Sequence, residues 1–277
     1  MSPSALHPAI MHKLIQPKIY ITLSSIMTHA RELMTVGPKD SSSVAIAAAE
    51  RGGFDQVAVG GSGKAIVGLV FVEELRNSPA DTAVAEHLVP VAKCMQLRTK
   101  DGISRAVRTL HTVPASLVTD GEKVAGLVHR SDLNKHPART YFYLWLSWLE
   151  MALARLIDVR LPGNAWIDLL GEQEQIQVLG KMEFESRRNN SISPIEYVDL
   201  SSLVRIVEES DRLQRELGFG SRRRVKDELG GLVELRHSIM HPVRTLVSDA
   251  ASMEKLASRE KRLRKTTLEV QKILRRA

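Results

Sequence analysis

The residues best suited to chemistry stand together in the run Leu235 to Pro242. Arg236 and His241 are five positions apart, and a proline follows the histidine. A guanidinium grips two phosphate oxygens in a fork and stays charged at any working pH, whereas an imidazole exchanges a proton near neutrality. Together these two groups could bind a phosphate and transfer a proton, so Arg236 and His241 are candidate catalytic residues.

A second histidine, His237, directly follows the arginine and is a further candidate of the catalytic set. His237 and His241 are four positions apart on one helix face, a spacing that also suits a metal ion, although no acidic third ligand stands in an obvious place. In a purely structural alternative, Arg236 pairs with Glu234 or another acid, and His241 simply ends the helix.

These residues close a helix predicted over about 223–240, whose apolar stripe is Leu229, Leu232, Val233 and Leu235. Five residues turn an ideal helix by roughly 140°, so Arg236 and His241 do not share one face unless the helix distorts near Pro242. Within one chain, the pair is poorly placed for a common substrate.

The remaining sequence from residue 137 onward also predicts helices only. Five of the twelve aromatic residues fall between 141 and 148, in a helix predicted over about 138–157 that is apolar on most faces. Glu150, inside this helix, is a candidate supporting acid of the same cleft, although a structural salt bridge is the commoner role of such a carboxylate. Further helices are predicted from a cap at Asn164 through Leu170, after Ser191–Pro194, over 199–217 up to Gly218 and Gly220, and over about 250–275.

An arginine followed five places later by a histidine and then a proline, late in an all-helical domain, resembles the Arg-x4-His signature of HEPN ribonucleases. The resemblance covers roughly residues 139–247 and departs at His237, where the family most often has asparagine. It implies a metal-independent endoribonuclease, with no cofactor for catalysis, in which a ribose 2′-hydroxyl attacks the adjacent phosphate. It also implies that two chains bring two such motifs to one composite cleft. We therefore expect a homodimer, and the aromatic helix offers a seam for it.

The first half of the chain is built on an internal repeat. Gly68–Leu75 (GLVFVEEL) recurs as Gly126–Leu133 (GLVHRSDL), and the copies start 58 positions apart (126 − 68 = 58). The same elements precede each copy in the same order, namely an amphipathic helix, a short β-rich run and a turn. They fall at 42–51, 56–59 and 60–63 in the first copy, and at 103–110, 115–118 and 120–122 in the second.

With Ser25–Thr28 and Leu33–Val36 as its opening, and Gly-Leu-Val-x-x-x-acid-Leu as its close, the repeat resembles a tandem pair of CBS domains over residues 24–136. The resemblance implies two packed modules whose clefts take adenine nucleotides or related ligands, with the acid after the Gly-containing strand bonded to the ribose hydroxyls. Asp132 stands at that position in the second copy, and a helix cap is an equally good explanation for it.

Two neighbours of Asp132 complete the predicted ligand site. His129 stands where the family usually has a hydroxyl residue, and Arg130 follows it; both are suited to a phosphate but depart from the family pattern. In the first copy, Glu74 replaces the aspartate and Phe71 replaces the hydroxyl residue, so the second cleft is the expected site for an adenine nucleotide.

The charge of the chain favours anionic partners. The formal net charge is +7 and the isoelectric point is near 9.6, which suits RNA, although a solvated basic surface explains the same charge. A first basic cluster predicts contacts with an RNA backbone at Arg222, Arg223, Arg224 and Lys226. The last helix carries a second cluster at Lys261, Arg262, Arg264 and Lys265, and a seven-residue stripe at Leu256, Leu263 and Val270 that is typical of a coiled coil.

The length of 277 residues is enough for two domains. The repeat and the helical patterns predict α/β plus all-α architecture: an N-terminal segment over 1–23, the tandem pair over 24–136 and a helical domain over 137–277. The single cysteine excludes a disulfide or a Cys-based zinc site within one chain and favours a reducing, cytoplasmic compartment. No secretory signal is expected, and the apolar stretch 141–157 is short and interrupted by charges, so we expect no contact with a membrane.

These features lead to one hypothesis and one rival. The hypothesis is a nucleotide-sensing pair of modules that regulates a dimeric ribonuclease. In the rival, the helical half only dimerises or holds RNA, without catalysis.

Overall fold

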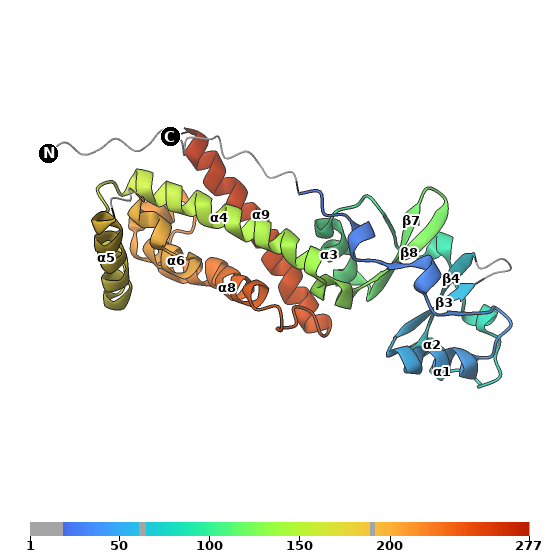
Figure 1. Ribbon diagram of the computed structural model, residues 1–277. Coiled ribbons are helices and arrows are strands. Elements are labelled where there is room, and N and C mark those ends of the chain that lie inside the picture. Colours follow the sequence, from blue (N-terminus) through green and yellow to red (C-terminus); the bar gives the residue numbers. More distant parts are fainter. Residues whose placement is uncertain (1–18, 61–64, 189–191, 277) are drawn as a thin grey trace. The chain divides into compact units, whose positions relative to one another are not determined.

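The computed structural model describes residues 19–60, 65–188 and 192–276 (Figure 1). This part of the chain forms two compact units. The α/β unit comprises Tyr20–Tyr141 together with Thr245–Ala257. The helical unit comprises Phe142–Arg244 and the chain from Ser258 to the end of the last helix. The predicted segment 1–23 lies largely outside the described residues.

Two four-stranded sheets form the α/β unit, one around each copy of the repeat. The first has the order β2 (Thr35–Val36), β3 (Gln56–Gly60), β4 (Ile66–Phe71) and β5 (Val89–Pro90). The second has the order β1 (Thr28–His29), β8 (Lys123–His129), β7 (Ala115–Asp120) and β6 (Gln96–Arg98). The predicted α/β organisation with two equivalent modules is confirmed.

The two sheets exchange their edge strands. β1 precedes the first repeat in the chain but pairs antiparallel with β8 of the second. β5, just before the strands of the second repeat, pairs antiparallel with β4 of the first. Because each module completes the sheet of the other, neither sheet is complete without its neighbour.

The exchange explains why each repeated motif begins with glycine. A Cβ added at Gly126 would lie 2.3 Å from the carbonyl oxygen of Thr28 in β1, and one at Gly68 would lie 2.2 Å from that of Val89 in β5. A real Cβ does not approach a backbone oxygen so closely, so only glycine lets the exchanged strand lie against the motif strand.

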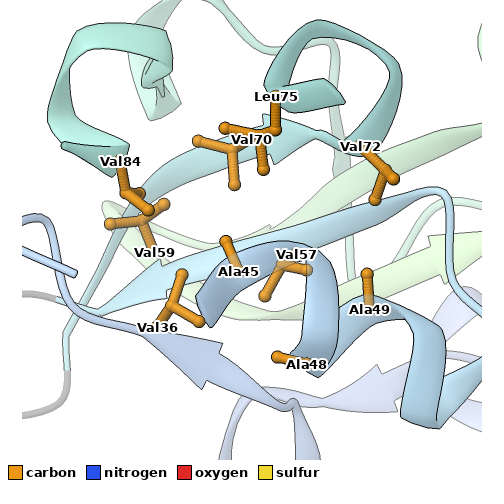
Figure 2. Packing of buried hydrophobic residues seen from close by; sticks show 10 residues of the cluster. All are labelled: Val36, Ala45, Ala48, Ala49, Val57, Val59, Val70, Val72, Leu75 and Val84. Atoms are coloured by element: carbon orange, nitrogen blue, oxygen red, sulfur yellow. The ribbon is translucent and has the colours of Figure 1, made fainter. Parts of the chain in front are cut away.

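Helices cover the sheets through small and β-branched residues. The helices of this unit are α1 (Ser42–Gly52), α2 (Val72–Arg76) and α3 (Ile103–Thr112). Figure 2 shows alanines of α1 packed against valines of the first sheet, in the cluster Val36, Ala45, Ala48, Ala49, Val57, Val59, Val70, Val72, Leu75 and Val84. A second cluster joins the two modules through Ala58, Ile66, Leu69, Ala115, Leu117 and Leu127.

The helical unit contains α5 (Glu172–Arg187), α6 (Leu200–Glu209), α7 (Asp211–Glu216) and α8 (Arg222–Met240), together with most of α4 (His136–Arg160) and α9 (Ala250–Arg276). The first residues of α4 and α9 belong to the α/β unit. α6 and α8 lie side by side (Figure 1). As its sequence predicts, α4 is buried on most faces, with Phe142, Trp145, Leu149 and Leu153 inside. Short 3-10 helices lie at Leu23–Ser25, Ala30–Glu32, Val84–His87, Val91–Lys93, Arg130–Asn134, Ile167–Leu169 and Pro194–Tyr197.

The helical half differs from the prediction in its connections. Asn164 caps no helix, because it adopts a left-handed conformation with φ 64°, and only the 3-10 helix Ile167–Leu169 follows. The helix predicted over 199–217 is broken at Ser210, whose side chain accepts a hydrogen bond from the backbone N–H of Leu213 and so starts α7. After Ser191, which lies outside the described residues, only the 3-10 helix Pro194–Tyr197 forms.

The stripe predicted for a coiled coil on α9 is already used within the single chain. Leu256, Leu263 and Val270 are all buried there. They therefore belong to the core and offer no free seam for another helix. Among the described residues, no helix is long and apolar enough to cross a bilayer.

Candidate functional site

The candidate motif occupies the last turn of α8. A hydrogen bond from the backbone N–H of Arg224 to the side chain of Ser221 starts this helix, at 3.3 Å. One face is buried through Val225, Leu229, Leu232, Leu235 and Ile239. The helix ends where the N–H of His241 donates to the carbonyl of His237, at 3.2 Å. The last turn therefore places Arg236 at the edge of the core and both histidines in solvent.

Arg236 meets Glu150 of α4, which confirms that a basic residue compensates this carboxylate. Its Nε lies 3.4 Å from Oε1 of Glu150. The two side chains line a cavity of about 120 Å³ together with Tyr143, Leu146, Ser147, Ile239 and Met240. Glu234, the other acid considered for Arg236, pairs with Arg259 instead. The structural alternative for Arg236 is thus realised through a different acid, and the resulting pair faces a cavity.

Burial raises the pKa of Glu150, and the positive charge of Arg236 opposes this shift. Between the ordinary glutamate pKa of about 4.3 and the higher pKa of Glu150 in the fold, the folded state binds more protons than the unfolded state. The contribution of Glu150 to the free energy of unfolding therefore falls as pH rises through this range.

We expect Glu150→Gln to remove that loss. The melting temperature of the variant, relative to the wild type, should rise between pH 4 and pH 7, as measured by circular dichroism. Glu122→Gln, on an exposed turn, is the matched control and should show a flat difference. A difference for Glu150→Gln that is flat or falls with pH would contradict the assignment.

The two histidines form a tilted ring pair at the end of α8. Their ring centroids are 4.4 Å apart, at an interplanar angle of 57°. The nearby charge of Arg244 is the main cause that lowers the pKa of His237, and His241 and Arg236 add to it. These positive charges favour the neutral form of His237 and give this end of the helix a local field that attracts anions. Among the described residues, no group of three His, Cys, Asp or Glu side chains could hold a metal ion, so the pair has no third ligand there.

The single chain does not bring Arg236 and His241 into contact. The guanidinium turns toward Glu150 of α4, whereas His241 lies beyond the last turn, against His237. This agrees with the angular separation predicted from the five-residue spacing.

The first basic cluster is divided between paired and free side chains. Arg222 pairs with Glu209, and Arg223 lies 3.9 Å from Asp227. Arg224 and Lys226 are exposed, and neither makes an ion pair within the described part of the chain. These two are the best placed of the predicted RNA-contacting residues.

In the second repeat, both oxygens of Asp132 already have partners. Oδ2 accepts a hydrogen bond from the backbone N–H of His129 at 2.7 Å, and Oδ1 lies 2.7 Å from Nζ of Lys135. The carboxylate thus caps the 3-10 helix Arg130–Asn134, as the cap alternative predicts. A ribose would have to displace Lys135 to reach it.

The two neighbours of Asp132 also have local partners. Nδ1 of His129 lies 2.9 Å from Oγ of Ser131, and burial lowers the pKa of this histidine. Arg130 donates to the carbonyls of Leu110 and His111 at the end of α3, at 2.7 and 3.3 Å. Arg130 is therefore tied to the helix end, and His129 is the freer of the two predicted phosphate contacts.

Three residues near these sites were missed in the sequence. Lys135 follows Asp132 by three positions, a spacing typical of a local ion pair. Arg244 follows His241 by three positions and charges the end of α8. Asn134 accepts hydrogen bonds from the N–H groups of Leu246 and Val247, at 2.6 and 3.1 Å, and donates to the carbonyl of Val247 at 2.8 Å. No sequence pattern indicates a contact between positions so far apart.

No family model matches the chain, and no curated protein matches it. Among solved structures, it is similar to the CBS domain of a bacterial CNNM/CorC family Mg2+ transporter in complex with ATP, with 19% identity over 40% of this chain and 83% of that one, at a TM-score of 0.36. It is also similar to the CBS-pair protein CBSX2 from Arabidopsis thaliana, with 18% identity, 44% and 95% coverage and a TM-score of 0.37. A CBS domain-containing protein from Bacillus anthracis matches with 11% identity, 40% and 88% coverage and a TM-score of 0.36.

Proposed function

We propose that this protein is a dimeric, metal-independent endoribonuclease whose activity responds to an adenine nucleotide bound by the tandem α/β unit. The observation that carries the proposal is the last turn of α8. It combines a half-exposed guanidinium, Arg236, with two solvent-facing histidines in a field of positive charge.

Each group has a role in attack by the 2′-hydroxyl on the adjacent phosphate. Arg236 stabilises the charge on the phosphorane, and the histidines transfer the protons to and from the reacting oxygens. His237 is suited to act as the base, because the positive charges around it lower its pKa and so favour the form that accepts a proton. Glu150 is a positioning residue, since it orients the guanidinium through their ion pair.

A second chain would solve the separation of Arg236 from His241. Two large apolar side chains that line the cavity are exposed, Tyr143 of α4 and Met240 of α8. Met151 of α4 and Val243, beyond the end of α8, are exposed as well. Burial of this surface against its own copy would bring two motifs together and exclude water from the phosphate.

An RNA cleavage assay tests this function directly. We expect the wild type to cut single-stranded RNA in excess EDTA and to leave 2′,3′-cyclic phosphate ends, because the attacking group is the ribose hydroxyl. RNA whose 2′-hydroxyls are methylated should resist. If no RNA is cut, or if cutting needs a divalent metal, the nuclease proposal fails and the non-catalytic alternative gains.

The proposed regulation rests on Asp132 and on its neighbour Asn134. Asn134 fastens residues 246 and 247, which continue the chain from the candidate motif. A ligand that displaces Lys135 from Asp132 changes the charge and hydrogen bonding next to the contact of Asn134 with residues 246 and 247. The ligand-bound and ligand-free forms then hold the end of the candidate motif with different energies.

We expect Asp132→Ala to weaken adenine nucleotide binding about tenfold or more, since a carboxylate makes charge-assisted bonds to ribose hydroxyls. Titration calorimetry with AMP, ADP and ATP measures this. Glu74→Ala, at the matching position of the first repeat, is the control and should bind the nucleotide as the wild type does.

Asn134→Ala should bind the nucleotide as the wild type does, but the bound nucleotide should no longer change the rate of RNA cleavage. Equal nucleotide binding by all variants, or RNA cleavage that a bound nucleotide does not change, would contradict the proposed regulation and leave the nuclease proposal standing.

A further inference from the structure

Helix α5 exposes an apolar face on which the described chain places only Arg188, whose guanidinium lies 5.4 Å from the ring centroid of Phe184. Ile176, Leu179 and Phe184 are 64%, 50% and 56% exposed, although they are large hydrophobic residues. On the opposite side, Val178 is buried and attaches the helix to its own unit. An α-helix that is apolar on both sides packs against a neighbour on each side, and the described part of the chain supplies only one.

The exposed residues form one continuous stripe. At 100° per residue, Ile176, Leu179, Gly180 and Phe184 fall on the same side of an ideal helix. A side chain at Gly180 would meet nothing within 4 Å among the residues that the structure describes. Glycine inside a helix costs about 0.5 to 1 kcal/mol relative to alanine, and no contact within the described chain requires it here. A backbone that approaches this point from outside would require it.

We infer that a second copy of this chain packs its own α5 antiparallel against this face, with Leu179 of each copy at Gly180 of the other. The charges of α5 favour this orientation. Glu172 lies on the stripe at the N-terminal end of the helix, and Arg187 lies on it at the C-terminal end. An antiparallel copy places Glu172 opposite Arg187, whereas a parallel copy sets like charges against each other.

Within the single chain, Arg187 is only loosely held. It pairs with Glu183, but both side chains are exposed, at 75% and 67%, so the pair contributes little. Arg187 is therefore available to a carboxylate of the second copy. A contact between two helices of this length is small for a protein interface, so the association depends on protein concentration. It uses a different surface from the proposed nuclease dimer and does not rest on the nuclease function.

Disulfide trapping tests the orientation in the full-length protein. The background variant is Cys94→Ser, which removes the only native thiol. Gly180→Cys should form an intermolecular disulfide under mild oxidation, because the two positions meet near the symmetry axis. Gln173→Cys is the matched control, since an antiparallel pair separates the two copies of that position by about 20 Å along the helices. A parallel pair would link Gln173→Cys readily, and that result would overturn the inference.

A mass measurement provides an independent readout. Leu179→Glu should lower the mass observed by sedimentation at high protein concentration, because the charge cannot be buried in the contact between the two copies of α5. Val44→Glu, on an exposed residue of α1, is the matched control and should leave the mass unchanged. An unchanged mass for Leu179→Glu, or no disulfide from Gly180→Cys, would exclude this contact. Leu179→Glu should still cleave RNA at the wild-type rate, because the α5 contact uses a different surface from the nuclease site. The sedimentation result and the cleavage result therefore test the two proposals separately.

Discussion

Substitution of His241 or Arg236 by alanine is expected to reduce RNA cleavage about a hundredfold or more, since general acid–base catalysis and charge stabilisation each contribute at least that factor. Both side chains are partly or fully exposed at the end of α8, so the fold should survive. The rate is measured with a labelled RNA in EDTA. Arg236→Lys should recover little, because an ammonium keeps the charge but loses the fork that holds two oxygens.

The control substitutions are His111→Ala and Arg51→Ala, an exposed histidine and an exposed arginine of the α/β unit. They should cleave at wild-type rates. If Arg236→Ala and His241→Ala also cleave normally, any activity of the preparation has another source, and the proposed site is wrong.

A mixture of the two inactive variants tests whether two chains share the site. If each site takes its arginine from one chain and its histidine from the other, a mixed dimer has one intact site and one site that lacks both groups. Random exchange makes about half of the dimers mixed, so the mixture should cleave at about a quarter of the wild-type rate. Complementation is measured after subunit exchange at high protein concentration. A mixture as inactive as its components would show that one chain supplies both groups.

The second large effect is expected at Gly126. Gly126→Ala should lower the stability of the α/β unit by about 3 kcal/mol. The added Cβ would lie 2.3 Å from the carbonyl oxygen of Thr28 and 3.3 Å or less from other backbone atoms, and backbone cannot move aside as a flexible side chain does. The exchanged strand β1 would have to leave β8. Thermal unfolding followed by circular dichroism measures the loss.

The same substitution in a helix provides the control. Gly230→Ala lies inside α8, where a Cβ would meet nothing within 4 Å, so it should stabilise the protein by about 0.5 to 1 kcal/mol. Gly68→Ala should behave like Gly126→Ala, because its Cβ would lie 2.2 Å from the carbonyl oxygen of Val89. If Gly126→Ala is as harmless as Gly230→Ala, the strand exchange is not as tight as described.

The sequence by itself determined the elements with clear periodicity. The repeated motif revealed two equivalent α/β modules, and apolar spacing located α1, α3, α8 and α9 to within a few residues. Local turns were harder. Asn164 has the composition of a cap but takes a left-handed turn, and Ser210 breaks a helix because its hydroxyl competes for the backbone. Helix α5 was missed, because a helix that is apolar on both sides lacks the periodicity that identifies an amphipathic one.

Only the tertiary structure decided which partners the site residues have. The spacing of Arg236 and His241 is a local property, so their angular separation followed from helix geometry alone. The pairing of Arg236 with Glu150 rather than Glu234 depends on how α4 packs against α8, and the clamp of Asn134 on Val247 joins positions more than a hundred residues apart. The exchange of β1 and β5 is of the same kind. Such contacts depend on the packing of whole elements, which no short pattern of residues encodes.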